Sequence, residues 1–187
     1  VFWLVFGIFL KVHSGPIPYL LLIFSKLTFW NFFSQTLSAA AASLTSNSNL
    51  ISKSAFPREI LVLSSVSVRI VDLSVAVAVL ATLMFFYKIG VSFQILWLIP
   101  LVALEVILVI GLGLILASLN VYFRDIAALL PLLMTAWLFV TPVIYTLDSV
   151  PKNFQILLFL NPMTGINEVI RTSLNLHRPP DLTALAF

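Results

Sequence analysis

Cysteine is absent from the 187-residue sequence, and charged residues make up only 9% of it. The first absence excludes disulfide bonds and cysteine metal sites. The second argues against an ordinary soluble domain, in which about 25% of residues are charged. The lysine and arginine residues are scattered along the chain rather than clustered. We therefore expect no nucleic-acid-binding face.

The sequence also lacks the patterns of common catalytic sites. It contains no GxxxxGK[ST] segment, so this chain does not bind ATP through a P-loop. Its carboxylates are single and dispersed, which argues against paired acid–base chemistry. The two histidines, His13 and His177, lie far apart. We expect no catalytic residue, no metal site and no cofactor in this chain.

Apolar residues dominate instead, at 61% of the chain and a mean hydropathy of +1.13. A soluble protein of this size has too little interior to bury them, whereas lipid is a suitable solvent. Only helices and closed barrels span lipid, and the apolar runs do not alternate as barrel strands do. We predict an all-α, polytopic transmembrane helical bundle. The expected spans cover about residues 1–10, 19–44, 70–87, 95–119 and 126–145.

The region after residue 145 is punctuated by prolines. The segment of about 152–160 is too short to span a membrane. Asn161–Pro162 predicts an N-cap and a first-turn proline, which open a short helix over about 162–176. One face of this helix is an apolar stripe, which is formed by Met163, Ile166, Val169, Ile170 and Leu174. We expect two short amphipathic helices that lie at the membrane surface or re-enter the membrane.

Two pairs of opposite charge have the spacing of neighbours on one helix face. Arg69 and Asp72 are three residues apart, and so are Glu168 and Arg171. Side chains at this spacing meet on a helix. We predict an ion pair between Arg69 and Asp72, which neutralises charge that lipid would otherwise disfavour. Arg171 either pairs with Glu168 in the same way or meets a lipid phosphate.

Single polar and small residues interrupt the apolar runs. Lys26 is expected to extend its ammonium group to the nearer membrane surface. Glu105 lies in the middle of its run and either makes a buried structural hydrogen bond or lines a transport path. Gly111 and Gly113 are expected to permit close helix packing.

Aromatic residues gather in the second and fifth runs. Aromatic belts at the membrane interface are the usual reason for such groups. A lining of a channel, in which the rings stack on sugars, is the alternative. The residues concerned are Phe29, Trp30, Phe32, Phe33, Trp137 and Phe139.

Three stretches together resemble one family. They are Asn47 to Glu59, Leu119 to Leu133 and Thr141 to Arg171, with IPY at 17–19 and FWNFF at 29–33 in agreement. In this order and spacing they are similar to the ABC-2 type permeases that export bacterial polysaccharides, such as O-antigen, capsule and teichoic acid. The resemblance covers nearly the whole chain. Lys26 departs from it, because these permeases tend to have a small residue near this point.

The resemblance implies a subunit with six spans that works as a homodimer in the bacterial inner membrane. It implies two separate ATP-hydrolysing ABC subunits on the cytoplasmic side, which hold ATP and magnesium. The cargo that it implies is a lipid-linked glycan, and the surrounding membrane lipid is a further partner. By this comparison the present sequence is a fragment that lacks the cytoplasmic N-terminal helix and the last span.

The resemblance also implies which residues contact the ATPase. The loop between the second and third runs matches the coupling region, although a solvated turn is the plainer interpretation without the resemblance. The next cytoplasmic turn contacts the ATPase, pairs its two charges with each other or caps the following helix. The loop residues are Lys53, Phe56, Pro57, Arg58 and Glu59, and the turn residues are Arg124 and Asp125.

The short helices after residue 145 match the external gate helices of the family. Prolines set the bends between their rigid pieces. The gate residues implied are Pro142, Tyr145, Pro151, Asn161, Pro162, Glu168 and Arg171. The residues implied as a channel lining are Phe29, Trp30, Phe33 and Glu105.

Other functions fit parts of the same pattern. An ABC-2 permease for a drug or a small lipid has the same fold with a narrower, less aromatic lumen. A membrane-embedded enzyme that acts on polyprenyl substrates requires clustered carboxylates, which the sequence lacks. A structural assembly protein without transport activity is the third alternative.

Overall fold

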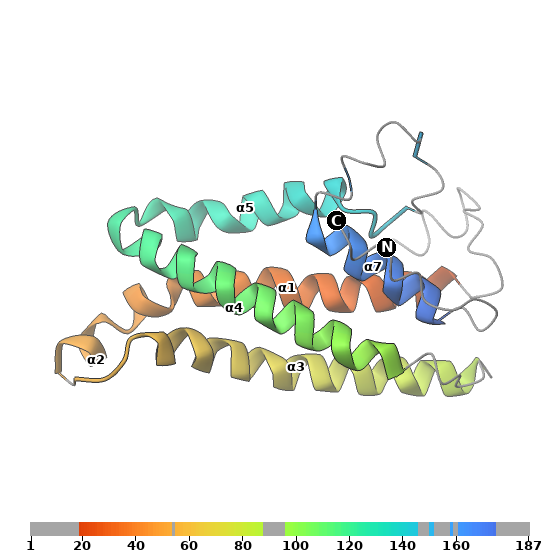
Figure 1. Cartoon of the computed structure of the whole chain (residues 1–187), viewed down its shortest axis with the longest axis horizontal. Helices are drawn as coiled ribbons and strands as arrows, with labels where there is room; N and C mark the ends of the chain where they lie inside the picture. Colours follow the sequence, from red (N-terminus) through yellow and green to blue (C-terminus); the bar gives the residue numbers. More distant parts are fainter. Residues whose placement is uncertain are drawn as a thin grey trace. The chain divides into compact units, whose positions relative to one another are not determined.

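The computed structural model describes residues 19–53, 55–87, 96–145, 150, 151, 158 and 161–174. The predicted run 1–10 lies outside these residues, and so does the predicted helix 152–160 apart from residue 158. Figure 1 labels the helices α1 (Tyr19–Ser46), α2 (Ser48–Lys53), α3 (Glu59–Phe86), α4 (Leu98–Tyr122), α5 (Asp125–Val140) and α7 (Pro162–Leu174). The described residues contain no strand, which confirms the all-α class.

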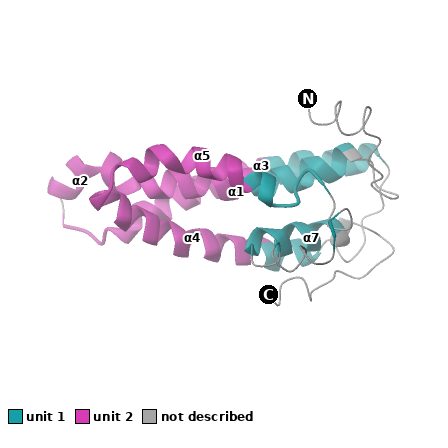
Figure 2. Cartoon of the chain, turned by 90° about the horizontal axis from the view of Figure 1, so that it is seen from above, with its two compact units in different colours: residues 1–30, 76–101, 138–187 teal, residues 31–75, 102–137 magenta. Residues whose placement is uncertain are grey.

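The chain divides into two compact units, which Figure 2 shows in different colours. Unit 1 comprises residues 1–30, 76–101 and 138–187, and unit 2 comprises residues 31–75 and 102–137. The boundaries fall within α1, α3, α4 and α5. Each of these helices therefore contributes residues to both units.

The core of unit 2 is the contact of α1, α3 and α4. Ala40, Val62 and Ala117 form a buried cluster, one residue from each helix. A Cβ atom at Gly113 would lie 2.9 Å from the Cβ of Ala40 and 3.5 Å from the Cγ1 of Val62. The close packing predicted at Gly113 is therefore confirmed. The same prediction is wrong for Gly111, where an added Cβ meets nothing within 4 Å.

Helix α1 is the most polar of the long helices, and its polar side chains are satisfied locally. Ser25 and Thr36 are fully buried. Their hydroxyl groups donate hydrogen bonds to the carbonyl oxygens of Leu22 and Phe32, one turn earlier. Such bonds to the preceding turn remove the cost of burying a hydroxyl group.

Helices α3 and α4 are long and apolar enough to cross a membrane. Only 17% of the apolar window of α3 and 22% of that of α4 is buried, so they are not the core helices of a soluble protein. Val71 of α3 and Ile107 of α4 are 63% and 67% exposed. The apolar surface that these helices present is suited to lipid.

The other helices differ from the predicted spans in polarity or length. Helix α1 has 28 residues and is long enough to cross a membrane, but it is less apolar than α3 and α4. Residues such as Lys26, Asn31 and Gln35 lower its mean hydropathy. Helix α5 has 16 residues and ends at Val140, before the predicted end at 145. Helix α3 begins at Glu59, well before the predicted start at about 70, since three serines and Arg69 at positions 64–69 interrupt its apolar pattern.

Candidate functional site

The segment between α1 and α3 in unit 2 is built by local hydrogen bonds. The backbone N–H groups of Leu50 and Ile51 donate to the carbonyl oxygen of Asn47, at 3.0 and 3.1 Å. Lys53 lies in the last turn of α2, where a cation is favourable to the helix dipole. The first turn of α3 contains Glu59, whose charge is favourable there for the opposite reason.

The five predicted coupling residues lie along this segment. Lys53, Pro57, Arg58 and Glu59 are exposed, whereas Phe56 is half-buried. The segment therefore presents two cations, one anion and part of an aromatic ring to its surroundings. That the ATPase receives the Phe56 ring stays a prediction.

Arg58 and Arg124 line one cavity of about 570 Å³, although they come from different turns of unit 2. Neither guanidinium has a hydrogen bond or an ion pair with any residue that the structure describes. The other lining residues are Leu44, Thr45, Ser48, Ile51, Ser52 and Val121. Two cations therefore line this cavity without a carboxylate. The local pairing of Arg124 with Asp125 is not found in the described part, and Asp125 lies in the first turn of α5.

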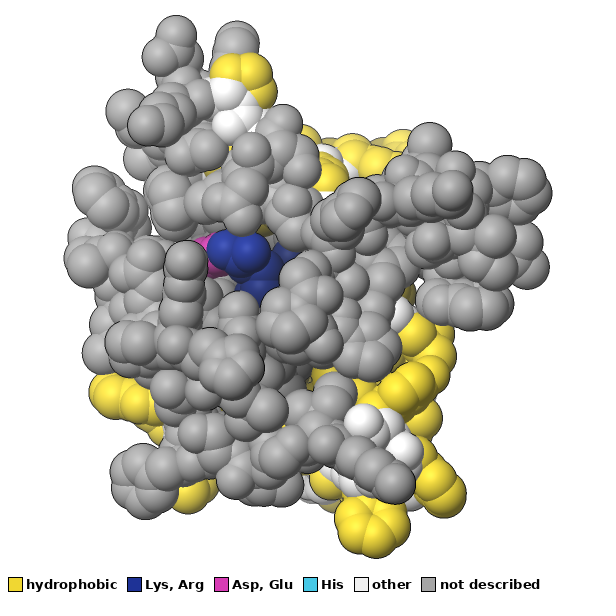
Figure 3. Space-filling view, turned by 90° about the vertical axis from the view of Figure 1, so that its right-hand side faces the viewer, with side chains coloured by type: hydrophobic (Ala, Val, Ile, Leu, Met, Phe, Trp, Pro, Cys, Tyr) yellow, Lys and Arg dark blue, Asp and Glu magenta, His cyan; other side chains and the backbone are white. Residues whose placement is uncertain are grey.

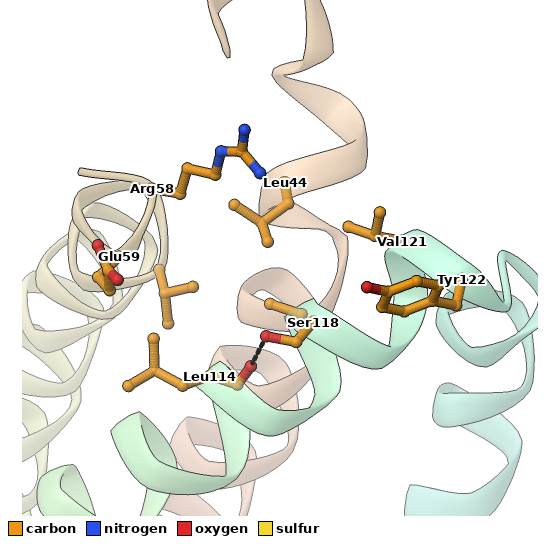
Figure 4. A pocket seen from close by; sticks show the side chains of 9 residues that line it. Leu44, Arg58, Glu59, Leu114, Ser118, Val121 and Tyr122 are labelled. Carbon is orange, nitrogen blue, oxygen red and sulfur yellow. Dashed lines mark hydrogen bonds between the residues drawn. The ribbon is translucent and has the colours of Figure 1, made fainter. Parts of the chain in front are cut away.

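A second cavity of about 250 Å³ continues from the first, because Leu44, Arg58 and Val121 line both. Its other lining residues are Glu59, Val62, Leu114, Ala117, Ser118 and Tyr122. Figure 4 shows Arg58 directed toward Leu44, and Glu59 directed away from it. Tyr122 lies on the opposite side of the pocket from Arg58.

Asn120 joins three helices of unit 2, and sequence reasoning missed it. Its buried amide nitrogen donates to the Ala41 carbonyl oxygen at 3.0 Å and to the Thr45 Oγ1 at 3.1 Å. Its Oδ1 accepts a hydrogen bond from the Ala127 N–H at 3.1 Å. The last turn of α4 is thus bonded to α1 and to the first turn of α5. An asparagine at the end of an apolar run was the available signal.

In unit 1, the turn after α5 is held by a buried lysine. The Nζ atom of Lys26 donates to the carbonyl oxygens of Pro142, at 2.8 Å, and Tyr145, at 3.4 Å. Lys26 is only 1% exposed, so the prediction that it reaches the membrane surface is wrong. The Tyr145 hydroxyl donates to the Val140 carbonyl oxygen at 3.2 Å. Two predicted gate residues are therefore connected to α1 and α5, whereas Pro151 is exposed.

Asn161 caps α7 as predicted and connects it to the same turn. The N–H of Met163 donates to the Asn161 Oδ1 at 3.1 Å, and Pro162 is the first residue of the helix. The Asn161 amide nitrogen donates to the Thr141 Oγ1 at 2.7 Å. The cap therefore both starts α7 and attaches it to the residues that follow α5.

Helix α7 itself is buried over a wider surface than its apolar stripe. The stripe residues Met163, Ile166, Val169 and Ile170 are buried, and so are the polar residues Thr164 and Asn167 between them. A lone helix at the membrane surface exposes its polar face, whereas protein covers the polar residues of α7. Its placement at the membrane surface stays a prediction. The alternative, a helix that re-enters the membrane, is compatible with this burial.

The ion pair predicted for Arg69 and the first alternative for Arg171 are both present. Arg69 Nη1 lies 2.9 Å from Asp72 Oδ2. In α7, Arg171 Nε donates to Glu168 Oε1 at 2.9 Å. Figure 3 shows a place on one face of the molecule where cationic and acidic side chains lie beside each other. The second pair adds no net charge to the predicted gate.

The predicted lining residues are buried within the single chain. Phe29, Trp30 and Phe33 are at most 3% exposed, so the prediction of a lipid-facing belt is wrong for them. Phe33 contacts Trp137 edge to face, with the ring centroids 5.6 Å apart. Glu105 is fully buried, and neither carboxylate oxygen has a hydrogen-bond partner among the described residues. The structural hydrogen bond expected for Glu105 is thus not found there.

Known proteins resemble this chain over most of its length. A profile described as ABC-2 type transporter matches residues 1–175. Two O-antigen export system permease proteins RfbA from Klebsiella pneumoniae are 27% identical over 168 residues, which cover 89% of this chain and 64% of each relative. The protein of the same name from Myxococcus xanthus is 26% identical over 187 residues, which cover 99% of this chain and 71% of that relative. The chain therefore spans less than two thirds of the Klebsiella relatives, at 64%.

Proposed function

Because the chain belongs to the ABC-2 type transporter family, we propose that it is a permease subunit of an ABC transporter that exports a lipid-linked polysaccharide. The observation that carries the proposal is the family match over residues 1–175, together with similarity to proteins named as O-antigen export permeases. The cargo is of the O-antigen, capsule or teichoic-acid type. The chain is a transport subunit rather than an enzyme.

The proposal includes partners and a location. An ATP-binding ABC subunit holds ATP and magnesium and hydrolyses the nucleotide. A second copy of this chain completes the channel, and both copies cross the bacterial inner membrane several times. The apolar, mostly exposed surfaces of α3 and α4 support the membrane location.

The contacts in unit 2 support a physical route for coupling. Closure of the ATPase subunits displaces the exposed segment between α2 and α3. Asn120 bonds α4 to α1 and to the start of α5, so a displacement at this end reaches three helices together. The ATPase thereby biases an equilibrium between two channel states, and this chain breaks no bond in the cargo.

Crosslinking of the full-length permease to its ATPase subunit tests the coupling segment. The sequence has no cysteine, so a single cysteine placed by Phe56→Cys reports on one position. We expect F56C to crosslink to the ATPase, and Ile107→Cys, on the exposed apolar face of α4, to give no product. Absence of an F56C crosslink in a folded, co-purified complex contradicts the coupling assignment.

A further inference from the structure

We propose that the cavity lined by Arg58 and Arg124 binds the phosphate of an anionic membrane phospholipid, and that the adjoining groove between α3 and α4 holds an acyl chain. This site goes beyond the proposed export function and does not depend on the identity of the cargo. All the residues that form it belong to unit 2.

The charges of the cavity favour an anion over a cation, and both arginines are exposed at its wall. Arg58 and Arg124 line the same space of about 570 Å³ without a carboxylate in its wall. No residue that the structure describes bonds to either guanidinium. The planar fork of an arginine matches the oxygens of a phosphate group. Ser48 also lines this cavity and offers a hydroxyl donor, whereas the hydroxyl groups of Thr45 and Ser52 already donate to their own helices.

The second cavity provides room for an acyl chain beside the arginine cavity. It continues from the arginine cavity along Val62, Leu114 and Ala117, and Glu59, Ser118 and Tyr122 also line it. The Glu59 side chain is directed away from Leu44 (Figure 4). From Leu114 to Val121 a helix rises about 10 Å. The hydrocarbon of one leaflet is about 15 Å thick. A groove of this length, with cations at one end, matches a phosphate followed by the upper part of an acyl chain.

The position in the fold favours lipid over an acidic side chain of the ATPase. The arginine cavity lies where α3 begins and α4 ends, and these are the two helices apolar enough to span the bilayer. Basic pockets at this level between membrane helices bind anionic headgroups. A carboxylate from a soluble subunit would fill the arginine cavity alone and would leave the apolar groove empty.

Native mass spectrometry of the full-length permease–ATPase complex tests the site. The probes are phosphatidylglycerol and phosphatidylcholine with identical acyl chains, added to delipidated complex in detergent. We expect the wild type to retain phosphatidylglycerol preferentially, and the variant R58Q/R124Q to bind it at least about tenfold more weakly. The matched control is Lys53→Gln, which removes a nearby exposed cation that lines neither cavity and should bind like wild type.

A second variant tests the groove separately. Ser118 is exposed and lines the groove, so Ser118→Phe fills the groove without entering the buried cluster and should also weaken phosphatidylglycerol binding. Equal retention of the two lipids, or undiminished binding by R58Q/R124Q, overturns the proposal. Loss of the ATPase subunit with lipid binding intact in R58Q/R124Q overturns it in favour of a protein carboxylate. Displacement by millimolar inorganic phosphate overturns it in favour of a free-anion site.

Discussion

At the scale of single residues, Lys26 shows how a charge is accommodated in an apolar helix. Its ammonium group is buried and donates to two backbone carbonyls of the turn after α5. A buried charge is tolerated only when hydrogen bonds replace its hydration. The hydrogen bond also stabilises the turn, because Pro142 is buried and its carbonyl oxygen requires a donor.

Replacement of Lys26 by methionine should destabilise the protein. Met fills a similar volume but donates nothing, so the carbonyl of Pro142 loses its charged donor. Hydrogen bonds to charged groups contribute about 1.5–3 kcal/mol each, and we expect a loss of about 2 kcal/mol. Thermal unfolding of the detergent-solubilised full-length protein measures it. Lys53→Met, at an exposed position, should change stability by less than about 0.5 kcal/mol, and a K26M variant as stable as wild type would refute the role.

The contacts that could be predicted from sequence are the local ones. The ion pairs Arg69–Asp72 and Glu168–Arg171 follow from a spacing of three residues on a helix. The Asn161 cap follows from the residue types at a helix start. Lys26 contacts Pro142 across 116 positions of the sequence, and no local pattern encodes that separation. Its expected position at the surface was the ordinary one for an isolated lysine.

At the scale of elements, the packing of α4 against α1 depends on one glycine. Gly113 faces Ala40, and the two small residues allow the helices to approach closely. Gly111 is two residues away and therefore points in another direction, into open space. Composition identifies both glycines as packing candidates, but only the arrangement of the helices distinguishes them.

Leucine substitutions at the two glycines should have opposite effects. At Gly113 the new side chain meets Ala40 and Val62, and overpacking of this kind costs about 3 kcal/mol. At Gly111 nothing obstructs it, and the better helix propensity contributes up to about 1 kcal/mol. Thermal unfolding of G113L and G111L in the same detergent compares them directly. Equal melting temperatures would show that the close contact at Gly113 is absent.

Helix α7 illustrates where an element can be predicted and its environment cannot. The cap and the first-turn proline fix its start at residue 162, and the i, i+3, i+4 pattern indicates a helix. The same pattern suggested one exposed polar face. The structure buries Thr164 and Asn167 as well, so protein covers the polar side of the helix too. Periodicity records which side is apolar, not whether the polar side is also covered.

At the scale of the whole molecule, apolar surface is the property that decides the environment. Residues such as Val71, Val75 and Ile107 are more than 60% exposed in the chain. In water this area would be an aggregation surface, whereas lipid or a second membrane subunit covers it without cost. The cations at the α2 end, Lys53 and Arg58, are exposed as well. A protein with these two kinds of surface is suited to a membrane, with the α2 end at its aqueous boundary.

Cysteine labelling of the full-length permease tests this arrangement. A charged, membrane-impermeant maleimide reacts with a thiolate in water and is excluded from the hydrocarbon core. We expect K53C to react in inside-out vesicles and not in right-side-out vesicles, because the proposed function places α2 on the cytoplasmic side. I107C should react in neither until the protein is denatured. Labelling of I107C as fast as K53C in intact vesicles would contradict a lipid-covered α4. Labelling of K53C in right-side-out vesicles alone would place α2 on the opposite side from the ATPase.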